Sequence, residues 1–120
     1  MSVRGIRGAI TAKENDRAEI IRATDELLRE MIAVNDIDPD EIASAIFSVT
    51  EDLNAEFPAL AARKLGWKNV PLLCINEIAV PGSLGKCIRI LIHVNTEKKS
   101  QDIKHVYLGE AQKLRPDKGE

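Results

Sequence analysis

A predicted β-strand, Cys87-Ile88-Arg89-Ile90-Leu91-Ile92-His93-Val94, organises this sequence. Side chains alternate between the two faces of a strand, so positions 88, 90, 92 and 94 share one aliphatic face that we expect to be core. Arg89 lies on the other face. A guanidinium is costly to bury alone, so Arg89 requires an internal carboxylate or an anionic ligand, unless the strand lies at a sheet edge with Arg89 in water.

Length and composition favour a single globular domain spanning residues 1–120. Hydrophobic residues make up 44% of the chain and charged residues 30%, an ordinary balance for a folded protein. The formal net charge of -2 argues against nucleic-acid binding, which relies on a basic face. Only 3% of residues are aromatic, so a base-stacking surface is not expected either.

The two cysteines, Cys74 and Cys87, lie inside apolar runs and are expected to be reduced thiols. Without a third thiol or a histidine cluster, the sequence predicts no metal site, and it contains no phosphate-binding glycine loop or nucleophile elbow. We therefore expect a protein that works without cofactor, metal or covalent intermediate. No signal peptide or membrane-spanning stretch is visible, which predicts a cytoplasmic protein without membrane contact.

The periodicity predicts an α+β fold with one long and two short helices. The long helix begins at a cap, Asn15 or Asp16, and runs to about Val34. A short helical turn follows Asp38-Pro39, and another short helix begins at Pro58 and ends at Gly66. Besides the strand at 87–94, strands are predicted at 3–11, 43–50, 70–78 and 103–108, giving a mixed sheet of about five strands.

Several charged and polar residues at strand, helix or tail positions suit a small, multiply anionic ligand that carries a hydroxyl group. Arginine recognises carboxylates through two parallel hydrogen bonds, a glutamate can accept from a hydroxyl, and a tyrosine can donate. These residues are Arg7, Glu77, Arg89, Tyr107, Arg63 and Arg115.

Two further residues, Phe57 and Cys74, are candidates for such a site, each with a structural alternative. Phe57 precedes Pro58 at a helix mouth where it could meet a ligand, although an aromatic residue there is more often core. Strict alternation puts Cys74 and Glu77 on opposite faces of their strand. A shared site therefore requires a bulge between them or a contribution from the Cys74 backbone.

A series of motifs along the chain forms a pattern that is specific when taken together. The motifs are Arg4-Gly5-Ile6-Arg7-Gly8-Ala9, Phe57-Pro58-Ala59, Val70-Pro71, Cys74, Glu77, Lys86-Cys87-Ile88-Arg89, His105-Val106-Tyr107-Leu108 and Leu114-Arg115-Pro116-Asp117. In these motifs, their order and their spacing, the sequence resembles the AroH-class monofunctional chorismate mutases of the trimeric Bacillus type over nearly its whole length. No single motif decides this resemblance.

The resemblance implies a homotrimer with a pseudo α/β-barrel core and active sites between subunits. It also implies the reaction: the intramolecular Claisen rearrangement of chorismate to prephenate in phenylalanine and tyrosine biosynthesis. Arg89 and Glu77 would be catalytic, and Phe57 and Arg63 would come from the neighbouring subunit. The remaining substrate-binding residues would be Arg7, Cys74, Tyr107 and Arg115, the last on a partly mobile tail, 109–120.

Two departures from some relatives, Leu60 in place of lysine and Leu73 in place of threonine, put substrate affinity in doubt rather than the reaction. Two other functions remain open from the residues alone. One is an imine or enamine deaminase resembling the YjgF type, which also uses an interfacial arginine. The other is a non-catalytic module that binds an anionic metabolite.

Overall fold

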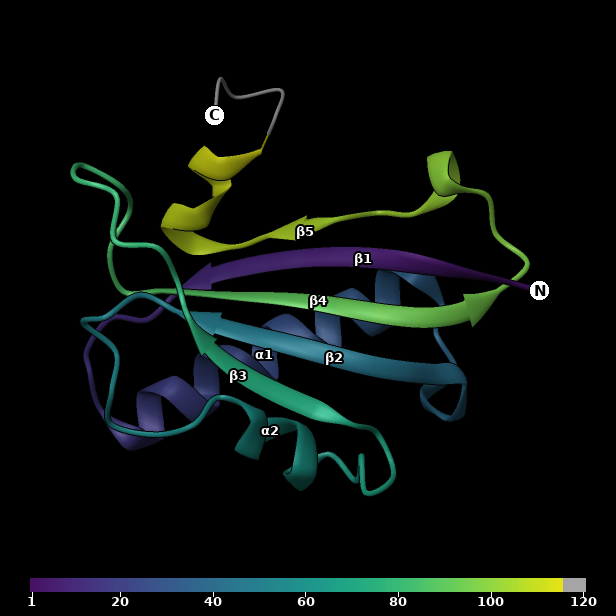
Figure 1. The fold of residues 1–120 in the computed structure, drawn as a ribbon, viewed down its shortest axis with the longest axis horizontal. Helices are drawn as coiled ribbons and strands as arrows, with labels where there is room; N and C mark the ends of the chain where they lie inside the picture. Colours follow the sequence, from purple (N-terminus) through teal and green to yellow (C-terminus); the bar gives the residue numbers. More distant parts are fainter. Residues whose placement is uncertain (116–120) are drawn as a thin grey trace.

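The computed structural model describes residues 1–115 and contains one mixed, five-stranded sheet in the order β3-β2-β4-β1-β5 (Figure 1). The strands are β1 (Ser2–Thr11), β2 (Ile42–Val49), β3 (Leu72–Asn76), β4 (Cys87–Thr96) and β5 (Val106–Tyr107). Strand β4 runs antiparallel to β1 and β2, while β3 and β5 pair in parallel with β2 and β1. The predicted α+β class and five-stranded mixed sheet are confirmed.

The strand that carries Arg89 is the central strand of the sheet, so the alternative of a solvated edge strand is wrong. Its predicted aliphatic face is buried, with Ile88, Ile90, Ile92 and Val94 at most 2% exposed. That face packs against α1 (Arg17–Asn35) and α2 (Ala59–Lys64), and Figure 1 shows α1 behind the sheet. The opposite face, which we call the outer face, carries Arg89.

Helix α1 begins as predicted, because the Asp16 side chain accepts a hydrogen bond from the Glu19 backbone N–H. It ends at Asn35, where Asp36 adopts a left-handed conformation with φ 51°. Gly8 on β1 allows α1 to approach closely, since a Cβ at that position would lie 2.4 Å from Met31 Sδ. The absence of a side chain at Gly8 therefore makes room for Met31 of α1 against β1.

The remaining helical segments are short 3₁₀ turns. The turn predicted after Asp38 is η1 (Pro39–Glu41), and the sequence reading missed η2 (Ser100–Asp102) and η3 (Gly109–Leu114). Within residues 1–115, no helix combines the length and hydropathy needed to span a membrane.

Two strands are shorter than predicted. The strand expected at 103–108 is reduced to Val106–Tyr107, because the Lys104 N–H donates to the Asn35 side chain at 2.7 Å instead of to a neighbouring strand. The strand expected at 70–78 covers Leu72–Asn76, so Glu77 lies just beyond its end. Both changes leave the predicted site residues at strand ends or next to them.

Candidate active site

The arginine of the central strand faces a carboxylate on the outer face of the sheet. Arg89 Nε lies 3.4 Å from Glu77 Oε2, and the two side chains are 26% and 30% exposed. The hydroxyl of Ser48 donates a hydrogen bond to the same carboxylate oxygen at 2.7 Å. Of the two partners that the sequence left open for Arg89, the internal carboxylate is present, and it is Glu77.

The contact between Arg89 and Glu77 is an ion pair without an aligned hydrogen bond at Nε. Arg89 Nε is covered from solvent and has no hydrogen-bond partner among the residues that the structure describes. Buried donors are nearly always satisfied, and an exception requires an explanation. We interpret the loose pairing as a sign that this guanidinium is held for interaction with a ligand.

A pocket of about 180 Å³ surrounds this pair. Its polar lining comes from Arg7, Ser48, Glu77 and Arg89, and its apolar lining includes Ile46, Ile75 and Leu91. Two cations beside one anion leave the pocket with an excess of positive charge, which suits an anionic ligand.

Arg7 and Tyr107 lie together at the edge of this region. The Arg7 guanidinium carbon stands 5.9 Å from the centroid of the Tyr107 ring, within the range of a cation–π contact. The Arg7 backbone N–H donates to His105 Nδ1 at 3.0 Å. Burial, assisted by the charge of Arg7, lowers the pKa of His105 and so favours the neutral ring that can accept this bond.

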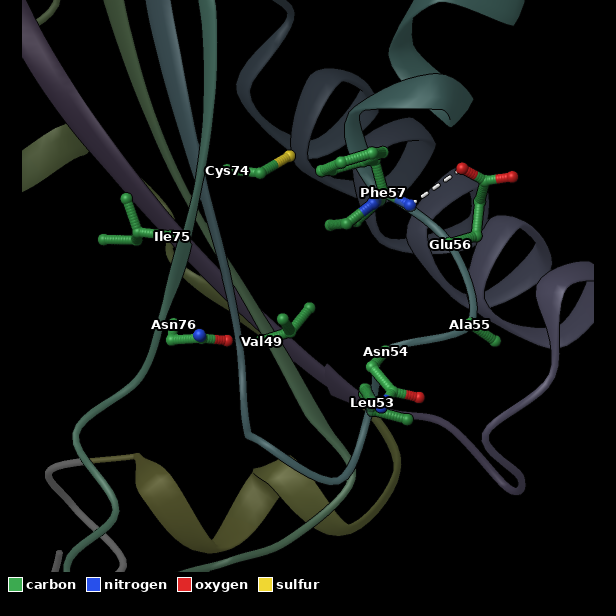
Figure 2. Close-up of a pocket in the computed structure, with 10 residues that line it drawn as sticks. Val49, Leu53, Asn54, Ala55, Glu56, Phe57, Cys74, Ile75 and Asn76 are labelled. Atoms are coloured by element: carbon green, nitrogen blue, oxygen red, sulfur yellow. Dashed lines mark hydrogen bonds between the residues drawn. The ribbon is translucent and has the colours of Figure 1, made fainter.

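Phe57 and Cys74 line a different pocket, of about 350 Å³, between β3 and the loop that leads to α2. Figure 2 shows the Cys74 thiol pointing toward Phe57, away from the outer face. The pairing of β2 with β3 is regular and matches Cys74 with the buried Phe47, so the bulge that would bring its side chain to Glu77 is absent. Burial raises the pKa of the Cys74 thiol.

The last two predicted arginines lie apart from Arg89. Arg63, in the last turn of α2, donates hydrogen bonds to the backbone carbonyls of Trp67 and Lys68. Arg115 lines a third pocket, of about 580 Å³, together with His105 and Tyr107. Pro116 and Asp117, the end of the last motif, lie outside the described residues.

One chain therefore brings Arg7, Glu77 and Arg89 into one pocket, with Tyr107 beside Arg7. Sequence reasoning assigned no role to Ser48 or His105, which hold Glu77 and the Arg7 backbone. Alternation along the strand predicted at 43–50 offered a signal for Ser48, because it separates a face that carries hydroxyl groups from the apolar face of Ala45, Phe47 and Val49. Across residues 1–115, no group of three or more His, Cys, Asp and Glu side chains is placed to hold a metal ion.

The fold and the site define a small α+β protein with a pocket on the outer face of its sheet that Arg7 and Arg89 line. Residues 3–118 match the family model for chorismate mutase type I. The chorismate mutase AroH of Thermus thermophilus is 52% identical over 116 residues, which cover 96% of this chain and 95% of that protein. The AroH of Bacillus subtilis is 43% identical over 118 residues, with coverages of 98% and 93%.

Among solved structures, a chorismate mutase from Clostridium thermocellum matches with a TM-score of 0.89 and 55% identity, over 90% of this chain and 96% of that one. This chain belongs to the type I chorismate mutase family. The resemblance drawn from the sequence motifs is confirmed, and nothing in these similarities supports the deaminase or the binding module.

Proposed function

We propose that this chain catalyses the rearrangement of chorismate to prephenate, as an isomerase of phenylalanine and tyrosine biosynthesis. The observation that carries the proposal is the loosely paired Arg89 and Glu77 at one pocket with Arg7, in a member of this family. The reaction is intramolecular and pericyclic, so it requires no proton transfer and no nucleophile from the protein. The site must instead select a reactive pose and stabilise charge that develops in the transition state.

Arg89 and Glu77 would act at opposite ends of the breaking bond. The Arg89 guanidinium would donate to the ether oxygen, which becomes more negative as the carbon–oxygen bond lengthens. Glu77 would accept from the ring hydroxyl and place negative charge near the electron-poor ring fragment. The hydrogen bond from Ser48 fixes one oxygen of Glu77 and restricts its rotation.

The remaining residues would restrict the substrate to a compact conformation. Arg7 would bind a carboxylate of chorismate, with Tyr107 stacked beside it and His105 holding its backbone. One preplaced donor contributes about 3 to 4 kcal/mol of barrier reduction. A millionfold acceleration requires about 8 kcal/mol, so pose restriction by Arg7 and its neighbours must supply much of the rest.

We further propose a homotrimer with active sites between subunits. Phe57 and Arg63 lie at or next to α2, in surroundings separate from the Arg89 pocket, so a second copy is needed to bring them to it. The outer face also exposes Val3, Leu73 and Ile75, which are 57%, 57% and 46% exposed in the single chain. Cys74 would contribute through its backbone, and the tail with Arg115 would help to close the site beside Tyr107.

A cytoplasmic location is the compartment that we propose for this enzyme. Both cysteines are free thiols, as expected in a reducing compartment. Cell fractionation with an antibody against the chain tests this location, and recovery in a membrane or extracellular fraction would contradict it.

The experiment that tests the activity is incubation of the purified chain with chorismate. Its mass in solution is first measured by light scattering, and the loss of chorismate absorbance and the formation of prephenate are then followed. We expect turnover by a species with three times the mass of the chain. Absence of turnover by a folded trimer would reject the mutase activity, and equal affinity for chorismate and a bicyclic transition-state mimic would favour a binding module instead.

A further inference from the structure

A pair of polar residues, Thr50 and Asp52, holds the segment that joins Glu77 to Arg89. We call this segment, residues 78–86, the connector. The Lys86 N–H donates to both carboxylate oxygens of Asp52, at 3.0 and 2.9 Å, and the Cys87 N–H donates to Thr50 Oγ1 at 3.0 Å. The Thr50 hydroxyl in turn donates to Asp52 Oδ1 at 2.5 Å, so the two side chains form one unit, the Thr50–Asp52 clamp.

The backbone at the end of the connector is strained, and the clamp is what stabilises it. Lys86 has φ 48°, a left-handed conformation that is unfavourable for residues other than glycine, asparagine and aspartate. Gly85 allows Asp52 to approach, because a Cβ at that position would lie 2.8 Å from Asp52 Oδ2. A non-glycine residue in this conformation persists only where its surroundings hold it, and here Asp52 binds its N–H.

Both ends of the connector are fixed on the same turn. At one end the Glu77 N–H donates to the Val49 carbonyl at 2.8 Å, and at the other the Thr50 N–H donates to the Cys87 carbonyl at 3.1 Å. Glu77 directly follows β3, and Arg89 lies two residues into β4. The turn that contains the clamp therefore continues the pairing by which β2 spaces the backbones that carry Glu77 and Arg89.

We propose that Thr50 and Asp52 are positioning residues that orient Arg89 toward Glu77 and toward the ligand, an inference that rests on the proposed mutase function. Glu77 alone does not fix the guanidinium, because Arg89 Nε makes no aligned hydrogen bond within residues 1–115. The direction in which β4 begins at Cys87 contributes to that orientation, together with the pairing of β4 with β1 and β2. Displacement of a catalytic group by about 1 Å can lower a rate about a hundredfold.

The decisive variant is Thr50→Val, which keeps the volume of the side chain and the charge of Asp52 but removes the acceptor of the Cys87 N–H. We expect kcat to fall about tenfold, with KM changed by less than about threefold, because the ether-oxygen contact strengthens in the transition state. Thr50→Ser restores the hydroxyl and should recover most of the lost kcat. Asp52→Ala removes both bonds to Lys86 and should lower kcat up to about a hundredfold.

Glu51→Ala is the matched control, since it removes an exposed carboxylate from the same turn and should leave kcat within about twofold of the parent. Active sites are titrated with a bicyclic transition-state mimic, so that kcat refers to folded enzyme. If Asp52→Ala does not fold, the comparison of Thr50→Val with Thr50→Ser decides whether the clamp positions Arg89.

The outcomes separate this inference from the proposed function. An active parent enzyme whose folded Thr50→Val and Asp52→Ala variants keep kcat within about twofold overturns the clamp alone. So does a loss confined to thermal stability, with kcat per titrated site unchanged. A parent enzyme without mutase activity overturns the proposed function and this inference with it.

Discussion

The molecule contains two kinds of arginine–carboxylate contact, and they differ in how fully the arginine is satisfied. On α1, Arg22 donates to both oxygens of Glu19 at 2.6 and 3.0 Å and also to Glu26 at 2.7 Å. The hydrogen bonds from Arg22, followed by the one from the Lys13 backbone N–H, lower the pKa of Glu19 to about 2. On the outer face of the sheet, Arg89 stands 3.4 Å from Glu77 without an aligned hydrogen bond at Nε.

Under the proposed function, the difference separates a structural contact on α1 from a functional one at Arg89. A guanidinium whose donors are occupied by side chains of its own helix stabilises that helix but has little left to offer a ligand. Arg89 is held by an apolar strand, close to a carboxylate that Ser48 already orients. It therefore keeps donors for a charge that develops only during the reaction.

The change with the largest expected effect is Arg89→Lys. Lysine keeps the positive charge but loses the planar, forked geometry. We therefore expect the activation free energy to rise by about 3 kcal/mol and kcat to fall roughly a hundredfold. KM should rise less than kcat falls, and steady-state kinetics measure both. Near-parental kcat in this variant would remove Arg89 from the mechanism and end the distinction drawn between the two contacts.

A substitution on the buried face of the same strand should lower stability rather than kcat. Ile90 is 2% exposed, and Ile90→Ala should lower the free energy of unfolding by about 3 kcal/mol through lost burial and a cavity. Urea unfolding at one fixed protein concentration measures this change, because dissociation of an oligomer makes stability depend on concentration. We expect kcat per active site to stay within about threefold, and a kcat loss like that of Arg89→Lys would show that the two faces of β4 are not separable.

Alternation and capping were sufficient to predict most of the fold. The apolar alternation around Arg89 identified a strand, and Asp16 marked the start of α1, because both signals are local. The central place of that strand in the sheet was not predicted. The end of the chain was harder to predict. The strand expected at 103–108 lost most of its length to a hydrogen bond with Asn35, a residue 69 positions away, and such a contact leaves no periodic signal.

The site was predictable in part for the same reason. Arg7 and Arg89 occupy strand positions whose faces follow from alternation, Glu77 directly follows a strand, and the three meet in one pocket. Alternation gives the face on which Ser48 lies, but no local pattern reveals its hydrogen bond to Glu77. The same holds for the clamp residues Thr50 and Asp52, whose partners also lie far along the chain. The place of Phe57 and Arg63 in a shared site depends on a second subunit, and it stays a prediction.

A matched substitution at the two carboxylates sharpens the comparison. Glu77→Gln keeps the shape of the side chain and the acceptor for Ser48 but removes the charge. We expect the activation free energy to rise by about 2 kcal/mol, with a matching loss of kcat, which is typical of lost hydrogen bonds to charged groups. Both side chains of the pair are partly exposed, so the free energy of unfolding should change by less than about 1 kcal/mol. Steady-state kinetics and urea unfolding on the same sample test the two halves of this expectation, and unchanged kcat would contradict the role given to Glu77.

The same substitution on the helix, Glu19→Gln, should have the smallest effect and the reverse pattern. We expect a loss of roughly 0.2 to 1 kcal/mol in the free energy of unfolding at pH 7, as for other ion pairs near a surface, with kcat unchanged. The folded-state pKa of Glu19, about 2, lies below the ordinary value of 4.5, so the folded protein binds fewer protons than the unfolded chain between these values.

The contribution of Glu19 is therefore fully present above pH 4.5 and is lost as the pH falls toward 2. Urea unfolding of parent and variant at a series of pH values should show a constant difference above pH 4.5 that shrinks below it. A difference that persists at pH 2 would mean that the Glu19 charge is not its source. A loss of kcat in Glu19→Gln would show that the Arg22–Glu19 contact on α1 also serves the reaction. Such an effect would have to pass through the packing of α1 against the strands that carry Arg7 and Arg89.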